Sequence, residues 1–172
     1  MFKEDIKNKI LEWLPYIIII IVVVIIRTYF YTPIRVNGTS MYPTLKQNDL
    51  MILNKIGLSK GINRWDIVVV KEENKYIIKR VIALPGEAVA YIDGNLYINK
   101  KQIEDKYSLS KTTDFNEIYL KDNEYFVMGD NRAVSADSRS IGPVKKEQIL
   151  GKTHIRFFPF NQIGNVEWIR IY

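Results

Sequence analysis

Cysteine is absent from this 172-residue sequence, and histidine occurs once, as His154. Without cysteine the chain cannot form disulfides, use a thiolate nucleophile or bind zinc through sulfur. A metal site would depend on one imidazole and on carboxylates, and the H-E-x-x-H, Walker A and G-x-G-x-x-G motifs are missing. We therefore expect neither a metal nor an organic cofactor.

Alanine is missing from the amino-terminal part of the chain, where the first alanine is Ala83. Lys3, Lys7 and Lys9 precede an apolar run, which is the order found in a secretory signal peptide. Cleavage of such a peptide requires a small-x-small site shortly after the apolar run, and no alanine stands there. The segment is therefore predicted to remain attached as an anchor.

The apolar run itself is unbroken and β-branched from Ile17 to Ile26. That is too short for a bilayer, which needs roughly 20 residues. If Arg27 extends toward the lipid headgroups, the range 14–32 is long enough and has aromatic residues at both interfaces. We predict a short tail at 1–13 and a transmembrane helix at 14–32.

Charge leaves the partner and the topology open. The formal charge is +6, which suits nucleic acid and an anionic lipid surface equally well. Positive residues on the two sides of the apolar run are nearly balanced, so the positive-inside rule does not orient it. With 47% hydrophobic residues, the chain is expected to fold as one principal domain with at most a small inserted subdomain.

After Pro33 the pattern changes to short β-rich runs separated by turn residues. These runs are 50–53, 67–70, 76–84, 88–92, 96–98, 125–128 and 154–158. A turn at 93–95 predicts a hairpin over 89–98. Residues 99–123 are polar and rich in lysine, and we expect an excursion from the sheet rather than core. The predicted fold is mainly β, an antiparallel β-sheet domain at 33–172 with a small β insertion at 86–123.

Ser40 stands in the stretch GTSMYPTL at 38–45, and a serine attacks a carbonyl only if a base takes its proton. In the strand at 76–84, alternation puts Lys79 in one row with Ile77, Val81 and Ala83. Desolvation in such a row lowers the pKa of a lysine from about 10.4, so that its neutral amine becomes a general base near neutral pH. Ser40 and Lys79 are therefore a candidate catalytic dyad.

Plainer interpretations stand beside this one. Ser40 could be an exposed serine next to a proline turn, and Lys79 could reach solvent. The stretch is not a G-x-S-x-G elbow, because Tyr42 occupies the place of the second glycine. His154, in a strand-like run, is interpreted as structural rather than catalytic.

Five sequence motifs follow one another along the chain in an order typical of one protein family. They are the apolar anchor, GTSMYPTL at 38–45, RWDIVV at 64–69, KRVIALPGE at 79–87 and GDNR at 129–132, the last followed by Ser135, Asp137, Ser138 and Arg139. In this order the chain resembles the bacterial type I signal peptidases, in the short Gram-positive form with a single amino-terminal anchor.

The resemblance implies that Ser40 is the nucleophile and that its backbone N–H belongs to the oxyanion hole. It implies that Lys79 is the general base and that the Ser135 hydroxyl hydrogen-bonds and orients the Lys79 amine. Two ion pairs, Asp137 with Arg139 and Asp130 with Arg80, are implied to hold the loop that carries Ser135. Residues next to the nucleophile are expected to bind substrate, namely Met41, Tyr42 and Pro43.

The chain departs from the family pattern at two places. Ala133 and Val134 replace the polar pair that usually precedes the loop serine. Gly38 lacks the hydroxyl that some members carry two residues before the nucleophile, so the second oxyanion donor is unidentified.

The resulting prediction is a membrane-bound serine endopeptidase that removes signal peptides from exported preproteins. Its catalytic domain would lie on the extracytoplasmic side of the cell membrane. The partners are expected to be preproteins and the lipid bilayer, not nucleic acid. Two alternatives are a self-cleaving serine-lysine repressor protease and a catalytically silent, membrane-tethered module that binds anionic lipid or nucleic acid.

Overall fold

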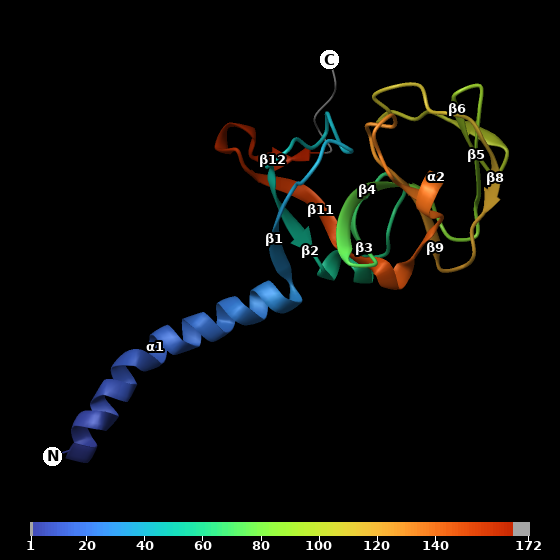
Figure 1. Cartoon of the computed structure of the whole chain (residues 1–172). Helices are drawn as coiled ribbons and strands as arrows, with labels where there is room; N and C mark the ends of the chain where they lie inside the picture. Colours follow the sequence, from blue (N-terminus) through green and yellow to red (C-terminus); the bar gives the residue numbers. More distant parts are fainter. Residues whose placement is uncertain (1, 167–172) are drawn as a thin grey trace.

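The structure is a computed structural model and describes residues 2–166 of the chain. One long helix, α1 (Phe2–Tyr29), extends away from a β domain that contains the strands (Figure 1). The short helices are η1 (Ile56–Lys60), α2 (Ser138–Ile141), η2 (Lys146–Gln148) and η3 (Phe160–Gln162). Met1 of the predicted tail and residues 167–172 of the predicted domain lie outside the described residues.

Helix α1 is apolar over most of its length. The 19 residues Leu11–Tyr29 have a mean hydropathy of 2.2, and none of this span is buried. Isoleucine and valine side chains along it are about half exposed, as Ile20 at 62% illustrates. The helix is therefore long and apolar enough to span a bilayer.

The last turn of α1 is fastened to the β domain through its carbonyl groups. Lys55 Nζ donates to Thr28 O at 2.7 Å, and Lys55 N donates to Phe30 O at 3.0 Å. Thr32 Oγ1 donates to Arg27 O at 2.8 Å. The last carbonyls of a helix lack intrahelical partners and carry partial negative charge, so a lysine there satisfies and stabilises them.

Eight strands form the main sheet, and all of its pairings are antiparallel. They are β1 (Tyr31–Arg35), β2 (Leu50–Asn54), β3 (Ile67–Glu72), β4 (Lys75–Ala83), β9 (Glu124–Met128), β10 (Val144–Lys145), β11 (Ile149–Phe158) and β12 (Gly164–Asn165). The order is β1-β2-β11-β3-β4-β9-β10, with β12 beside β11. The predicted mainly antiparallel β fold is confirmed. Strand β1 begins within the range predicted for the anchor, 14–32, because Tyr31 already pairs with Asn54.

A second sheet of four strands is inserted between β4 and β9 and lies on one side of the domain (Figure 1). Its order is β7-β6-β5-β8, formed by β5 (Ala88–Ile92), β6 (Asn95–Ile98), β7 (Lys101–Ile103) and β8 (Phe115–Tyr119). The predicted hairpin is present, and Asp93 and Gly94 take positive φ at its turn, as such tight turns require. The extent of an inserted subdomain at 86–123 stays a prediction.

The expectation for residues 99–123 is wrong in part. This segment contributes β7 and β8 to the small sheet, and Leu120 is buried in the core beneath it. Phe115 stacks on Phe126 at 5.4 Å between ring centroids. A few well-spaced apolar residues therefore anchor a segment whose overall composition is polar.

Strand β4 contributes to three hydrophobic clusters in turn. Ile78 packs near the loop between β1 and β2, Val81 packs in the central cluster, and Ile82 and Ala83 pack beneath the small sheet. The predicted row of Lys79 with Ala83 is incorrect, because a register shift between Val81 and Ala83 interrupts the alternation.

Candidate active site

The loop between β1 and β2 carries Ser40 and is closed at its neck. Val36 N donates to Asp49 O at 2.8 Å, and Asn48 N donates to Val36 O at 3.0 Å. Val36 is buried in the core before the serine, and Met41 and Leu45 are buried after it, which anchors the segment on both sides. The sequence thus places Ser40 on a short loop with apolar anchors rather than on a flexible connection.

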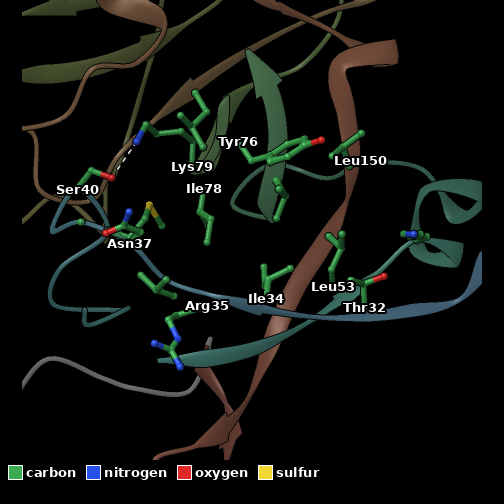
Figure 2. Close-up of a pocket in the computed structure, with 16 residues that line it drawn as sticks. Thr32, Ile34, Arg35, Asn37, Ser40, Leu53, Tyr76, Ile78, Lys79 and Leu150 are labelled. Atoms are coloured by element: carbon green, nitrogen blue, oxygen red, sulfur yellow. Dashed lines mark hydrogen bonds between the residues drawn. The ribbon is translucent and has the colours of Figure 1, made fainter. Parts of the chain in front are cut away.

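Lys79 reaches Ser40 from β4. Its Nζ lies 2.8 Å from Ser40 Oγ, and the contact is drawn as a dashed line in Figure 2. Lys79 is only 3% exposed, and this burial lowers the pKa of its amine, against the opposing influence of Asp137, Glu72 and Asp130. The structure therefore brings the two residues of the predicted dyad together and favours the neutral amine that a general base requires.

Arg80 forms a buried ion pair with Asp130 next to the candidate dyad. Its Nε and Nη2 donate to Asp130 Oδ1 and Oδ2 at 2.8 and 2.7 Å, and both side chains are 0% exposed. Thr44 Oγ1 donates to the same carboxylate at 2.5 Å. Because Thr44 belongs to the Ser40 loop, this pair ties β4, the loop after β9 and the nucleophile loop to one another.

Asp137 organises the loop after β9. Its carboxylate accepts from Arg139 Nε at 2.8 Å and from Gly129 N at 3.0 Å, and it also caps α2. Burial is the largest influence and raises the pKa of Asp137, but the hydrogen bonds from Arg139 and Gly129 leave that pKa below its ordinary value. Asn131 N donates to Ser40 O at 2.9 Å, so the loop also holds the backbone of Ser40.

Ser135 does not make the contact that the resemblance implies. Its hydroxyl is buried without a hydrogen-bond partner in the described part of the chain, although it lies near Asp137 and helps to keep that carboxylate ionised. Ser135 Oγ lies against Gly129, where an added β-carbon would stand 2.3 Å from it. A hydrogen bond from Ser135 to Lys79 is therefore absent from this arrangement.

An apolar pocket of about 450 Å³ opens beside the dyad (Figure 2). Ser40 and Lys79 stand at one end of it, and Thr32 and Lys55, which contact the end of α1, stand at the other. Much of the wall between them is apolar and comes from five strands, through Ile34, Leu53, Val69, Ile78 and Leu150, and from Val36 just after β1. The pocket therefore joins the candidate catalytic residues to the base of the membrane helix.

The three expected substrate-binding residues do not face one common pocket. Met41 lines the pocket, whereas Tyr42 is 45% exposed and Pro43 borders a different hollow beside Arg156. His154 lies in β11 at a register shift and makes no contact with Ser40 in the described chain. No group of three potential metal-ligating side chains occurs among residues 2–166.

The sequence analysis did not identify the residues whose hydrogen bonds hold the Ser40 loop in place. Thr44 and Asn131 fix the nucleophile loop, and Arg156 donates to Thr44 O at 2.6 Å from β11. Thr44 stands within the quoted stretch at 38–45, so the motif carried a signal. Arg156 stands in no motif, and only the pairing of β11 with β2 brings it there.

Comparison with known proteins agrees with this architecture. The family described as "Signal peptidase, peptidase S26" matches residues 10–158. Signal peptidase I S of Bacillus subtilis is 38% identical, over 91% of this chain and 94% of the relative. Signal peptidase I of Bacillus amyloliquefaciens is 38% identical, over 94% of this chain and 95% of the relative. Signal peptidase I of Streptococcus pneumoniae is 32% identical, over 92% of this chain and 97% of the relative.

Among solved structures, a signal peptidase I from Enterococcus faecalis is 34% identical in sequence. The superposition covers 53% of this chain and 95% of the Enterococcus chain, with a TM-score of 0.49. From the family match and the sequence relatives, the chain belongs to the signal peptidases of peptidase family S26. Within that family it is a type I signal peptidase of the Gram-positive kind, a hydrolase that cleaves signal peptides.

Proposed function

We propose that this enzyme is a membrane-anchored serine endopeptidase in which Ser40 is the nucleophile and Lys79 the general base. The observation that carries the proposal is the 2.8 Å contact between Lys79 Nζ and Ser40 Oγ at the end of the apolar pocket. A buried amine in reach of a hydroxyl supplies what His154 does not, namely a base next to the nucleophile.

In the first half of the reaction, neutral Lys79 takes the Ser40 proton while Ser40 Oγ bonds to the scissile carbonyl carbon. The carbonyl electron pair moves to oxygen, and the Ser40 N–H donates to that oxyanion. Lys79 then returns the proton to the departing amine as the peptide bond breaks, which leaves an ester on Ser40. In the second half, Lys79 takes a proton from water while the water oxygen bonds to the ester carbon, and Lys79 then returns that proton to Ser40 Oγ as the ester bond breaks, which restores the free hydroxyl and the neutral amine.

The two free strand edges along the pocket suit an extended peptide. Strand β1 pairs on one side only, and β4 pairs with β9 only from Arg80 onward among the described residues, which leaves 75–79 open on that side. A segment lying between these edges gains backbone hydrogen bonds and sends alternate side chains into the apolar pocket. We infer that the first and third residues before the cut are small and apolar.

The position of the pocket relates the site to the membrane. Since Thr32 and Lys55 both line it and bind the end of α1, a substrate in the pocket lies next to the point where the anchor leaves the bilayer. We infer that α1 holds the catalytic domain at the extracytoplasmic surface, where exported preproteins present their cleavage sites.

The test uses the full chain reconstituted in lipid vesicles with a synthetic preprotein. The wild-type enzyme is expected to release the mature protein, with the new amino terminus identified by mass spectrometry. Ser40→Ala and Lys79→Arg are expected to release none. Equal cleavage by wild type and Ser40→Ala would refute the proposal, and so would a folded wild-type enzyme that cleaves nothing.

A further inference from the structure

A serine peptidase needs hydrogen-bond donors at the oxyanion, and one donor is visible in this site. The Ser40 N–H donates to no group among residues 2–166, so it is free to bind the carbonyl oxygen. Preorganised donors at this position are the largest single contribution in many acyl transfers. If Ser40 is the nucleophile, as proposed above, a second donor should stand within reach of the same oxygen.

Two neighbours of Ser40 do not fill this role. Gly38 has no side chain, and its N–H donates to the side-chain oxygen of Gln47. Thr39 is exposed and is not among the residues that line the pocket. The second donor must therefore come from a residue that faces the pocket and has an N–H or O–H to spare.

Asn37 meets both conditions. It lines the pocket together with Ser40 and Lys79, and its amide lies on the Ser40 side in Figure 2. Gln47 Nε2 donates to Asn37 Oδ1 at 3.2 Å, so the oxygen of the amide is already engaged. Asn37 Nδ2 donates to no group in the described chain, and the hydrogen bond from Gln47 fixes it as the end of the amide that is left for a ligand.

The position of Asn37 is also well defined. It directly follows Val36, which is buried and makes both backbone hydrogen bonds at the neck of the loop. Gln47 bridges the same neck from the other side through its contacts with Gly38 and Asn37. The loop neck therefore fixes the backbone next to Asn37, and the hydrogen bond from Gln47 orients its amide, so the amide loses little freedom when substrate covers it, which is the property required of an oxyanion donor.

We propose that Asn37 Nδ2 is the second oxyanion donor and that Gln47 is a positioning residue that sets the orientation of the Asn37 amide. When Ser40 Oγ bonds to the carbonyl carbon, the new oxyanion accepts from Ser40 N–H and from Asn37 Nδ2. Asn37 is thus a catalytic residue by direct contact, whereas Gln47 acts only through Asn37.

The first test compares kinetics on a signal-peptide substrate. Asn37→Ala should lower kcat about a hundredfold or more with little change in KM, the scale found when one oxyanion donor is removed. Asn37→Asp keeps the shape but cannot donate, and it should lower kcat at least as far. Thr39→Ala, in the same loop but outside the pocket, is the matched control and should keep kcat within about twofold.

Gln47→Glu tests the orientation of the amide. A glutamate still accepts from the Gly38 N–H, but it can only accept from Asn37, so the amide turns its Nδ2 toward residue 47 and its oxygen toward the pocket. The expected result is a fall in kcat close to that of Asn37→Ala. Adding Gln47→Glu to Asn37→Ala should cost nothing further, because the two residues act as one unit.

Inhibition by a peptide aldehyde is a measurement that a general loss of stability would not change. Ser40 Oγ adds to the aldehyde carbon as Lys79 takes the Ser40 proton, the carbonyl electrons pass to oxygen, and the adduct carries the same oxyanion. Asn37→Ala should weaken this inhibitor by the same factor as kcat/KM, while a product peptide that forms no adduct should bind with unchanged Kd.

The outcomes separate the two proposals. If Ser40→Ala is inactive but Asn37→Ala and Asn37→Asp keep wild-type kcat, Asn37 is not an oxyanion donor and the Ser40 mechanism stands. A change of cleavage site or KM without a change in kcat would also overturn the inference, because it would make Asn37 a wall of the pocket. An active Ser40→Ala enzyme would overturn the mechanism itself.

Discussion

Gly129 occupies a position where a side chain has no room. A β-carbon there would lie 2.3 Å from Ser135 Oγ and 2.4 Å from Ser40 O, so either the loop or the nucleophile would have to move. Gly129→Ala should lower the free energy of unfolding by about 1–3 kcal/mol, the usual cost of overpacking, and should lower kcat as well. Thermal unfolding and turnover measure the two effects.

Gly57 provides the matched control. A β-carbon at Gly57 meets its nearest neighbour, the Asn54 side chain, at 3.5 Å, which is an ordinary contact. Gly57→Ala should therefore keep wild-type stability and activity. A Gly129→Ala enzyme as active as Gly57→Ala would show that Gly129 does not control the approach of the two serine loops.

Ser135→Ala separates two roles for the buried hydroxyl. If Ser135 turns to orient the Lys79 amine when substrate is bound, its loss should lower kcat about hundredfold, the scale of a misplaced catalytic group. Stability should fall only slightly, because the hydroxyl makes no hydrogen bond among the described residues and only helps to keep Asp137 ionised. Unchanged kcat with unchanged melting temperature would contradict the positioning role.

At the scale of the elements, the Arg80 and Asp130 pair joins three parts of the site in a region without solvent. Asp130→Asn leaves the Arg80 guanidinium buried without its counter-charge, and the free energy of unfolding should fall by about 3–5 kcal/mol in chemical denaturation. The exposed pair of Lys106 with Glu104 is the control, and Glu104→Gln should cost less than about 1 kcal/mol. Equal small effects in both variants would contradict the account.

An element could be predicted when its own residues specify it, and not when it depends on residues distant in sequence. The β-branched runs of β3 and β4, the apolar run of β9 and the turn at 93–95 specify strands and a hairpin by themselves, and all were predicted. Strand β8 was missed because its apolar residues are few, only partly buried and lie among polar ones. The register shift after Val81 was missed because it depends on the pairing with β9.

The same distinction applies to the site. The pairing of Ser40 with Lys79 was predictable because the residues around each one indicate its chemistry. The pocket walls and Arg156 were not, because strands distant in sequence supply them, and pairing in the sheet brings them together. Asn37 and Gln47 were missed because their roles depend on closure of the loop neck.

At the scale of the whole molecule, the absence of cysteine offers a test of the proposed topology. A single cysteine introduced by Tyr119→Cys, at a position 70% exposed on the small sheet, would be the only thiol in the chain. A membrane-impermeant maleimide should label it on intact cells without detergent. Labelling that appears only after the membrane is permeabilised would place the catalytic domain in the cytoplasm and refute the proposed orientation.

The account as a whole depends on Lys79 acting as a neutral base. Below its pKa the ammonium form cannot accept the Ser40 proton, so kcat/KM should rise with pH as Lys79 loses its proton. Burial lowers the pKa of Lys79, and the rise should therefore come below the ordinary lysine value of about 10.4.

The most direct test is kcat/KM against pH for the wild-type enzyme and for Lys79→Arg, measured in lipid vesicles on a signal-peptide substrate. The dyad predicts a rising limb below the ordinary lysine range for the wild type and no measurable turnover for Lys79→Arg, because arginine stays protonated at every pH of the scan. An active Lys79→Arg enzyme, or a wild-type profile without an ionisation below that range, would contradict it.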